Sequence, residues 1–159
     1  MTTTHTETTA LQIMERMLHE GFAQGRTEVV DELCSPDVVE HQFGLSGTGA
    51  EAIAKVKKGM TDVHTAFPDL RFVIADSVER DDTIWVRAEA SATNTGPFFG
   101  PPTGQHVEFT VMDVARIADG RIVEHWGVPD RFELLVRLGR LGAPVGSGAG
   151  TGAHGRDEG

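Results

Sequence analysis

Tyrosine is absent from the 159-residue sequence, and cysteine occurs once, as Cys34. A single cysteine leaves no internal disulfide, which fits a reducing cytoplasm. The lack of tyrosine removes the phenol that several small acid–base enzymes use to hydrogen-bond an oxyanion. No apolar run approaches the length of a membrane-spanning helix, and the first residues lack the basic and apolar regions of a secretory signal. We therefore expect a cytoplasmic protein without a membrane partner.

Basic residues are also scarce, because 14 lysines and arginines stand against 24 acids and give a net charge of −10. No basic stripe is present, which argues against a nucleic-acid partner, and the acidity is that of a soluble surface. The length is that of one domain, large enough to form a core without a disulfide or a structural metal.

The first part of the chain has the spacing of amphipathic helices, and the second part alternates as strands do. The helical part predicts helices at 9–23, 28–33 and 50–66, with a short extended segment at 37–41. The alternating part predicts strands at 71–78, 83–93, 109–117 and 121–128, followed by a helix at 131–138. This order indicates an α+β fold: a curved antiparallel sheet wraps around three N-terminal helices as a cone and encloses one pocket.

We expect this domain to span residues 9–141. Residues 1–8 are rich in threonine, and residues 142–159 are rich in glycine, alanine and serine without periodicity. Both compositions are typical of disordered termini.

The segment 109–130 is predicted to be a β-hairpin with one ionisable side chain in each strand, Asp113 and His125. With a two-residue loop Asp113 faces Trp126, whereas a three-residue loop, residues 118–120, places it directly opposite His125. Ionisable groups are costly inside a sheet without a partner, so we favour the three-residue loop.

The other face of this hairpin is expected to be apolar. The favoured register brings Arg116 and Glu124 together there, beside Met112, Val114 and Trp126. Apolar side chains that do not line the pocket need cover, and a second subunit is its simplest source. We therefore predict a homodimer through the sheet.

Asp113 and His125 have three interpretations. His125 can be a general base whose tautomer Asp113 fixes, or Asp113 can be the base while His125 donates to an enolate oxygen. The third is a buried structural pair that only fixes the register. Buried ionisable groups are typical of functional sites, so we favour catalysis.

His41 is the third catalytic candidate, as a second donor in the same cavity; the structural alternative is a strand-edge histidine bonded to the backbone. With His125 and Asp113 it could form a two-histidine, one-carboxylate metal site. The tight ligand spacing of such sites is missing, and we expect neither a metal nor a cofactor.

Other polar residues have ordinary structural interpretations. Asp69 and Asp130 stand where turn and helix caps are expected, Glu40 is expected to be solvated, and Cys34 is expected in the core.

Aromatic and apolar residues supply the candidate substrate contacts. Phe98 and Phe99, in a loop rich in glycine and proline, are expected to close over a flat substrate, and Trp85, Phe109 and Val111 are expected to line the pocket.

Three segments resemble the SnoaL-like polyketide cyclases, in the superfamily of nuclear transport factor two and ketosteroid isomerase. They are AFPDLRF (66–72), TGPFFGPPTGQHVEFT (95–110) and ARIADGRIVEHWGVPDRFELLVRLG (115–139), and the similarity covers residues 10–141. The resemblance implies a curved antiparallel sheet over three helices, often dimeric. It also implies cofactor-free ring closure of a polyketide ester by intramolecular aldol chemistry.

The sequence departs from the family at one position. In the best-known members, a catalytic carboxylate lies two residues after the last-strand histidine, and here that position is Gly127. Where those members have a histidine one strand away, this sequence has Asp113, and His41 falls where members often place a pocket histidine. The resemblance thus implies that this sequence keeps an acid and a histidine, and that the acid has moved from position 127 to Asp113.

We therefore predict a cofactor-independent acid–base enzyme that closes a ring in a polyketide-like small molecule. A hydratase, dehydratase or epoxide-opening hydrolase in the same pocket is one alternative. A non-catalytic binding or dimerisation module is another. A deep cavity reached by Asp113 and His125 favours an enzyme, and a filled cone favours a module.

Overall fold

The computed structural model describes residues 8–142. Its elements are α1 (Ala10–Arg16), the π-helix η1 (Met17–Ala23), α2 (Val29–Leu33), β1 (Cys34–Glu40), β2 (Gly47–Thr48), α3 (Ala50–Ala66), β3 (Arg71–Arg80), β4 (Thr83–Thr93), β5 (His106–Ala118), β6 (Arg121–Pro129) and α4 (Arg131–Arg137). The predicted α+β class is confirmed. The predicted disorder of 1–8 and 142–159 falls outside the described residues, apart from residues 8 and 142.

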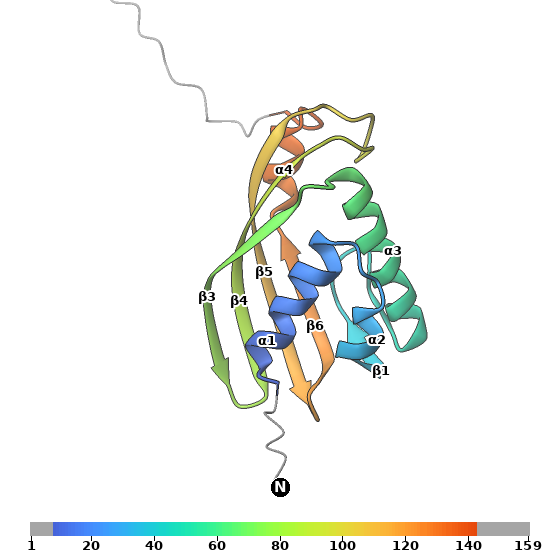
Figure 1. Ribbon diagram of the computed structural model, residues 1–159, viewed down its shortest axis with the longest axis vertical. Helices are drawn as coiled ribbons and strands as arrows, with labels where there is room; N and C mark the ends of the chain where they lie inside the picture. Colours follow the sequence, from blue (N-terminus) through green and yellow to red (C-terminus); the bar gives the residue numbers. More distant parts are fainter. Residues whose placement is uncertain (1–7, 143–159) are drawn as a thin grey trace, which may run out of the picture.

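The strands form one open sheet in the order β2-β1-β6-β5-β4-β3. Figure 1 shows a strongly curved sheet with α1 and α3 against one face and α4 at one end. The prediction of a wholly antiparallel sheet is wrong for one pair, because β1 runs parallel to β6. Such a pairing joins segments distant in the chain, so no local turn signal reveals it. The short strand β2 was not predicted.

The inner face of the sheet packs on the helices and forms the core. Alternate residues of β4, namely Ile84, Val86, Ala88 and Ala90, are at most 2% exposed, as the period of two predicted. The intervening residues face outward, among them Trp85, which is 38% exposed.

The first predicted helix is present, but its second half has π geometry. Thr9 caps α1 through a capping box with Gln12. From Met17 onward the backbone widens into η1, which carries Gly21 close to Met60: a Cβ at Gly21 would lie 2.6 Å from Met60 Cε. Wide π turns are often found at functional sites, and this one forms part of a cavity wall.

The β5–β6 hairpin has a different loop from the one predicted. Asp119 and Gly120 form a two-residue turn with φ of 50° and 70°, as type I′ turns require. A bulge then shifts the register, so that Arg116 pairs with Glu124 and Asp113 pairs with Gly127. The predicted Arg116–Glu124 pair is thus confirmed, whereas the three-residue loop and the direct opposition of Asp113 and His125 are wrong.

Among the described residues, 8–142, no helix has the length and apolarity needed to cross a membrane.

Candidate active site

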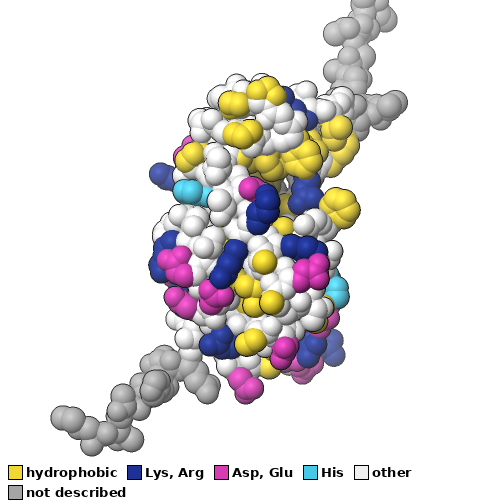
Figure 2. All heavy atoms as spheres, turned by 90° about the vertical axis from the view of Figure 1, so that its right-hand side faces the viewer, with side chains coloured by type: hydrophobic (Ala, Val, Ile, Leu, Met, Phe, Trp, Pro, Cys, Tyr) yellow, Lys and Arg dark blue, Asp and Glu magenta, His cyan; other side chains and the backbone are white. Residues whose placement is uncertain are grey.

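A cavity of about 330 Å³ lies between the helices and the inner face of the sheet. Figure 2 shows a hollow on the face that α3 occupies, with hydrophobic side chains above it and charged side chains at its rim. Most of the wall is apolar, contributed by η1, α3, β5, α4 and the loop after β4. Its charged or amide side chains are Gln42, Asp62, Asp113, His125 and Arg131. The volume and the apolar wall are those of a small-molecule site.

Three ionisable side chains from three neighbouring strands form one cluster, and two of them, Asp113 and His125, line this cavity. His125 of β6 has its Nδ1 2.8 Å from Glu40 Oε2 at the end of β1 and its Nε2 3.7 Å from Asp113 Oδ1 on β5. The carboxylates are nearly buried, because Glu40 is 6% and Asp113 7% exposed. The longer distance is an ion-pair distance, whereas the shorter one is a hydrogen bond.

These neighbours determine the charge of the histidine. Burial by itself lowers the pKa of His125, but the carboxylates of Asp113 and Glu40 outweigh burial and raise the pKa to about 10. The ring is therefore an imidazolium at neutral pH, and Nδ1–H donates to Glu40. A protonated ring accepts no further proton, so the proton acceptors of this cluster are the two carboxylates.

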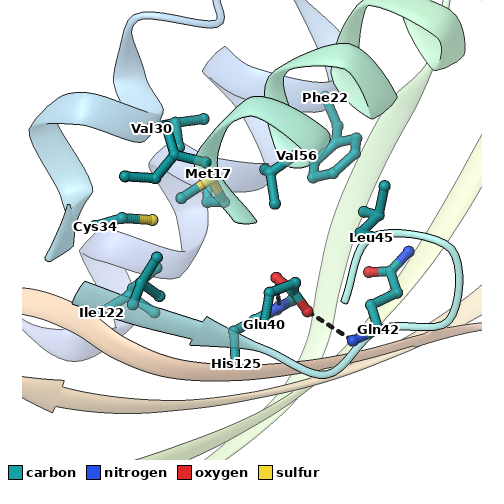
Figure 3. A pocket seen from close by; sticks show the side chains of 12 residues that line it. Met17, Phe22, Val30, Cys34, Glu40, Gln42, Leu45, Val56, Ile122 and His125 are labelled. Atoms are coloured by element: carbon teal, nitrogen blue, oxygen red, sulfur yellow. Dashed lines mark hydrogen bonds and ion pairs between the residues drawn. The ribbon is translucent and has the colours of Figure 1, made fainter. Parts of the chain in front are cut away.

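The two carboxylates differ in what they can reach. Asp113 lines the large cavity, whereas Glu40 lines a separate space of about 20 Å³ on the far side of His125. Figure 3 shows this smaller space, with Glu40, His125 and Gln42 along one wall. Asp113 is thus placed to contact a ligand, and Glu40 is placed to hold the histidine.

Glu40 was expected to be solvated, and this prediction is wrong. The parallel pairing of β1 with β6 places Glu40 beside His125 in register, and both side chains turn inward. The sequence signal that could have found it is the alternation of 40, 41 and 42, which puts Glu40 and His41 on opposite faces.

The expectation that His41 projects into the cavity is also wrong. Its ring stacks on Trp126, with centroids 4.7 Å apart, and its Nε2 lies 2.9 Å from Glu124 Oε1 on the outer face. Because His41 and His125 point to opposite sides of the sheet, the considered metal triad does not form. Within residues 8–142, no three histidine, cysteine, aspartate or glutamate side chains are arranged so that they could hold a metal ion.

Four of the five predicted substrate contacts line the cavity: Phe98, Phe99, Phe109 and Val111. The fifth, Trp85, was wrongly placed there, because it lies on the outer face opposite Val114 and Val78. Because side chains alternate along β4 and Ile84 and Val86 face inward, Trp85 between them must face outward.

The loop after β4 is held in place by Asn94, which is fully buried. Its amide donates to the Gly96 carbonyl, and its oxygen accepts from the backbone N–H and the hydroxyl of Thr103. At the loop's tip, Phe98 packs edge-on against Phe67 and Phe99. The hydrogen bonds of Asn94 at the start of the loop thus hold its aromatic tip over the cavity.

The remaining structural interpretations are confirmed for three residues. Asp69 accepts from the backbone N–H of Thr93, and Asp130 caps α4 by accepting from Glu133 N–H. Cys34 is buried in the core, and this burial raises the pKa of its thiol to about 12.

Comparison with known proteins agrees with this architecture. The family model of the SnoaL-like polyketide cyclases matches residues 12–138. Among solved structures, AclR of Streptomyces galilaeus, a candidate hydroxylase, has 31% identity and a TM-score of 0.69, over 81% of this chain and 83% of that one. IdmH of Streptomyces antibioticus, a candidate polyketide cyclase, has 32% identity and a TM-score of 0.66, over 81% and 97%.

A SnoaL-like protein of Jannaschia sp. CCS1, at 22% identity, shares the fold with a TM-score of 0.72, over 87% of this chain and 96% of that one. The curated protein sequences contain no significant match. The family match covers most of the described chain, from α1 to the end of α4. The chain therefore belongs to the SnoaL-like polyketide cyclase family.

Proposed function

We propose that the protein is a cofactor-independent cyclase that closes a ring in an aromatic polyketide-like substrate by intramolecular aldol chemistry. The observation that carries this proposal is the buried Asp113 carboxylate at the floor of an apolar cavity, with the His125 imidazolium beside it. The phenylalanines of the wall suit a flat, conjugated ligand.

The reaction needs one group that removes and returns a proton. Asp113 takes a proton from a carbon between two carbonyls, and the electron pair is delocalised as an enolate. The enolate carbon attacks a second carbonyl of the same molecule and forms a carbon–carbon bond. The new alkoxide recovers the proton from Asp113, so that no atom is gained or lost.

His125 supports this cycle without being the base. Its positive charge, 3.7 Å from Asp113 Oδ1, counters the negative charge of the enolate. Glu40 accepts a hydrogen bond from His125 Nδ1, and this contact holds the ring in place and keeps it protonated. This assignment selects the interpretation in which Asp113 is the base.

A model substrate can test the proposal directly: methyl benzoylacetate with a 2-oxopropyl group at the ortho position of its ring. Its active methylene attacks its side-chain ketone and closes a six-membered ring without a change in mass. Chromatography measures the rate of product formation, which is compared with the uncatalysed rate. Asp113→Asn should reduce turnover about 100- to 10,000-fold, the usual contribution of a general base. His125→Ala should lose turnover within the same range.

The matched control is Asp62→Asn, because Asp62 also lines the cavity but is exposed and paired with Lys58. It should keep turnover within a few-fold of the wild type. Full activity in Asp113→Asn, with an unchanged melting temperature, would contradict the proposal. If the wild type binds the model substrate tightly, but neither it nor any variant closes the ring, the protein is a binding module.

The relative named as a hydroxylase supplies a second candidate function. Ring closure leaves the mass of the model substrate unchanged before any loss of water, whereas hydroxylation, which would need dioxygen and an added two-electron donor and would release water, adds one oxygen. Mass spectrometry of the same reaction therefore separates the two.

A further inference from the structure

Gly127 leaves a space on the inner face of β6, and the end of another side chain fills it. A Cβ at this position would lie 2.1 Å from Gln42 Oε1 and 2.9 Å from Gln42 Cδ. Gly127 is not among the glycines with positive φ, so the lack of a side chain here provides room and not backbone freedom. The carboxamide of Gln42 thus occupies the place that a side chain at 127 would take.

The same space borders the proposed base. Asp113 pairs with Gly127 across the β5–β6 ladder, and Asp113 Oδ1 lies 3.1 Å from the position that a Cβ of Gly127 would have. A carboxylate and a carboxamide therefore flank one spot on the cavity floor. Both Gln42 and Asp113 line the cavity.

Gln42 is anchored by its backbone while its side chain stays available. Its backbone N–H donates to Glu40 Oε1 at 2.7 Å, an interaction drawn in Figure 3. In residues 8–142, no hydrogen bond engages its carboxamide, although the residue is half-buried. The Glu40 carboxylate therefore positions both His125 and Gln42, and the carboxamide is left for a ligand.

A carboxamide at this place supplies what the aldol step otherwise lacks, a neutral donor. A half-turn of the side-chain amide presents its NH₂ in place of its oxygen, and the neighbouring Asp113 carboxylate favours the NH₂ end. When Asp113 removes a proton, negative charge develops on a carbonyl oxygen next to the reacting carbon. A donor already fixed beside that oxygen lowers the barrier.

We propose that the Gln42 carboxamide donates a hydrogen bond to the substrate oxygen that becomes the enolate, and that Gly127 makes room for it. This inference rests on the proposed ring-closing function and narrows its substrates. The ligand must present a carbonyl oxygen toward Gln42 while its acidic C–H faces Asp113.

The first test replaces the donor and keeps the shape. Gln42→Met retains the length of the side chain without an N–H, and Gln42→Glu replaces the amide by a carboxylate. Both should lower kcat on the model substrate by about 100- to 1,000-fold, the usual loss for one oxyanion donor, with little change in KM or melting temperature. An unchanged kcat in Gln42→Met would overturn the inference.

The second test is a double-mutant cycle with Gly127→Ala. The added methyl group collides with the flexible end of Gln42 and should displace the carboxamide, so Gly127→Ala alone should lower kcat. In a Gln42→Ala background there is no carboxamide to displace, and the same change should have almost no effect. An equal loss in both backgrounds would mean that the methyl group acts through Asp113, and the inference would fail.

Failure of this inference differs from failure of the proposed function. An inactive Asp113→Asn together with an active Gln42→Met would remove only the donor role of Gln42. An active Asp113→Asn would remove the proposed base and with it the basis for the donor.

Discussion

Replacing Glu40 by Gln tests whether the inner carboxylate controls the histidine. Glu40 Oε2 lies 2.8 Å from His125 Nδ1, and the two side chains are 5% and 13% exposed. The substitution removes a buried negative charge and keeps the shape. The chain also offers a control on the outer face, Glu124→Gln, because Glu124, whose side chain is 22% exposed, pairs there with His41 and Arg116.

The expected loss of stability follows from the burial of the pair. A hydrogen bond to a charged group contributes about 1.5–3 kcal/mol. Glutamine keeps one oxygen, which can accept from His125 Nδ1–H, but its NH₂ group then faces the backbone N–H of Gln42, so Glu40→Gln should lower the free energy of unfolding by about 1.5–3 kcal/mol at neutral pH. The control should change it less, since the side chains of Glu124 and of its two partners are 22–44% exposed and solvent screens their pairs.

The pH dependence is the sharper readout. The pKa of His125 is raised in the folded protein from 6.5 to about 10 by Asp113 and Glu40 against burial. The stabilisation is therefore complete below the unfolded pKa and is lost as the pH rises through the folded pKa. Chemical denaturation should give a deficit for Glu40→Gln that is largest below pH 6.5 and shrinks toward pH 10.

Activity should follow the same protonation. In the wild type the alkaline limb of kcat/KM on the model substrate should fall near pH 10, because the imidazolium is part of the active form. With only Asp113 left to raise the pKa of His125, Glu40→Gln should move that limb toward neutral pH. An unmoved limb and an unchanged unfolding free energy would refute the role given to Glu40, and equal effects in Glu124→Gln would show that they are nonspecific.

Three other changes have defined outcomes. We propose that the outer face of the sheet forms a homodimer, and Met112→Glu, at a side chain that is 44% exposed, should then convert a dimer to a monomer in sedimentation at micromolar concentration; a monomeric wild type would contradict it. Phe99→Ala, at the cavity but 67% exposed, should keep the melting temperature and raise KM about 2- to 10-fold; a drop in melting temperature would mean a core role. Asn94→Ala should lower the free energy of unfolding by about 1–3 kcal/mol in denaturant titrations because it leaves buried groups of the loop unpaired, and an unchanged midpoint would count against that network.

Most of the fold could be predicted because its signals are local. The helix at 50–66 and the strand at 83–93 have the predicted bounds, and each is defined by its own periodicity and by its flanking residues. The parallel partner of β6 has no such local signal. Its strand, β1, was expected as a short extended segment, but nothing in residues 34–40 shows which strand it pairs with.

The candidate site was predicted for the residues that one hairpin brings together. Asp113 and His125 share the inner face even though the loop length was wrong, because the bulge next to the turn, in β6, restores their common side of the sheet. The predicted facing directions of Glu40 and His41 were reversed, because the direction in which each side chain points depends on which strand β1 joins and in which register. A one-residue error of this kind moves a side chain to the other face.

Asp113 places a carboxylate at the floor of the cavity although position 127 is a glycine. Asp113 pairs with Gly127, and its Oδ1 lies 3.1 Å from the position that a Cβ of Gly127 would have, so its carboxylate borders the same space from the neighbouring strand. A side chain at 127 would compete for that space with both Asp113 and Gln42. Gly127, Asp113 and Gln42 therefore share one space. Replacing Gly127 by Asp should consequently lower activity, although it restores the carboxylate that the family's best-known members carry there. A Gly127→Asp variant with full turnover and an unchanged melting temperature would show that the two positions are independent.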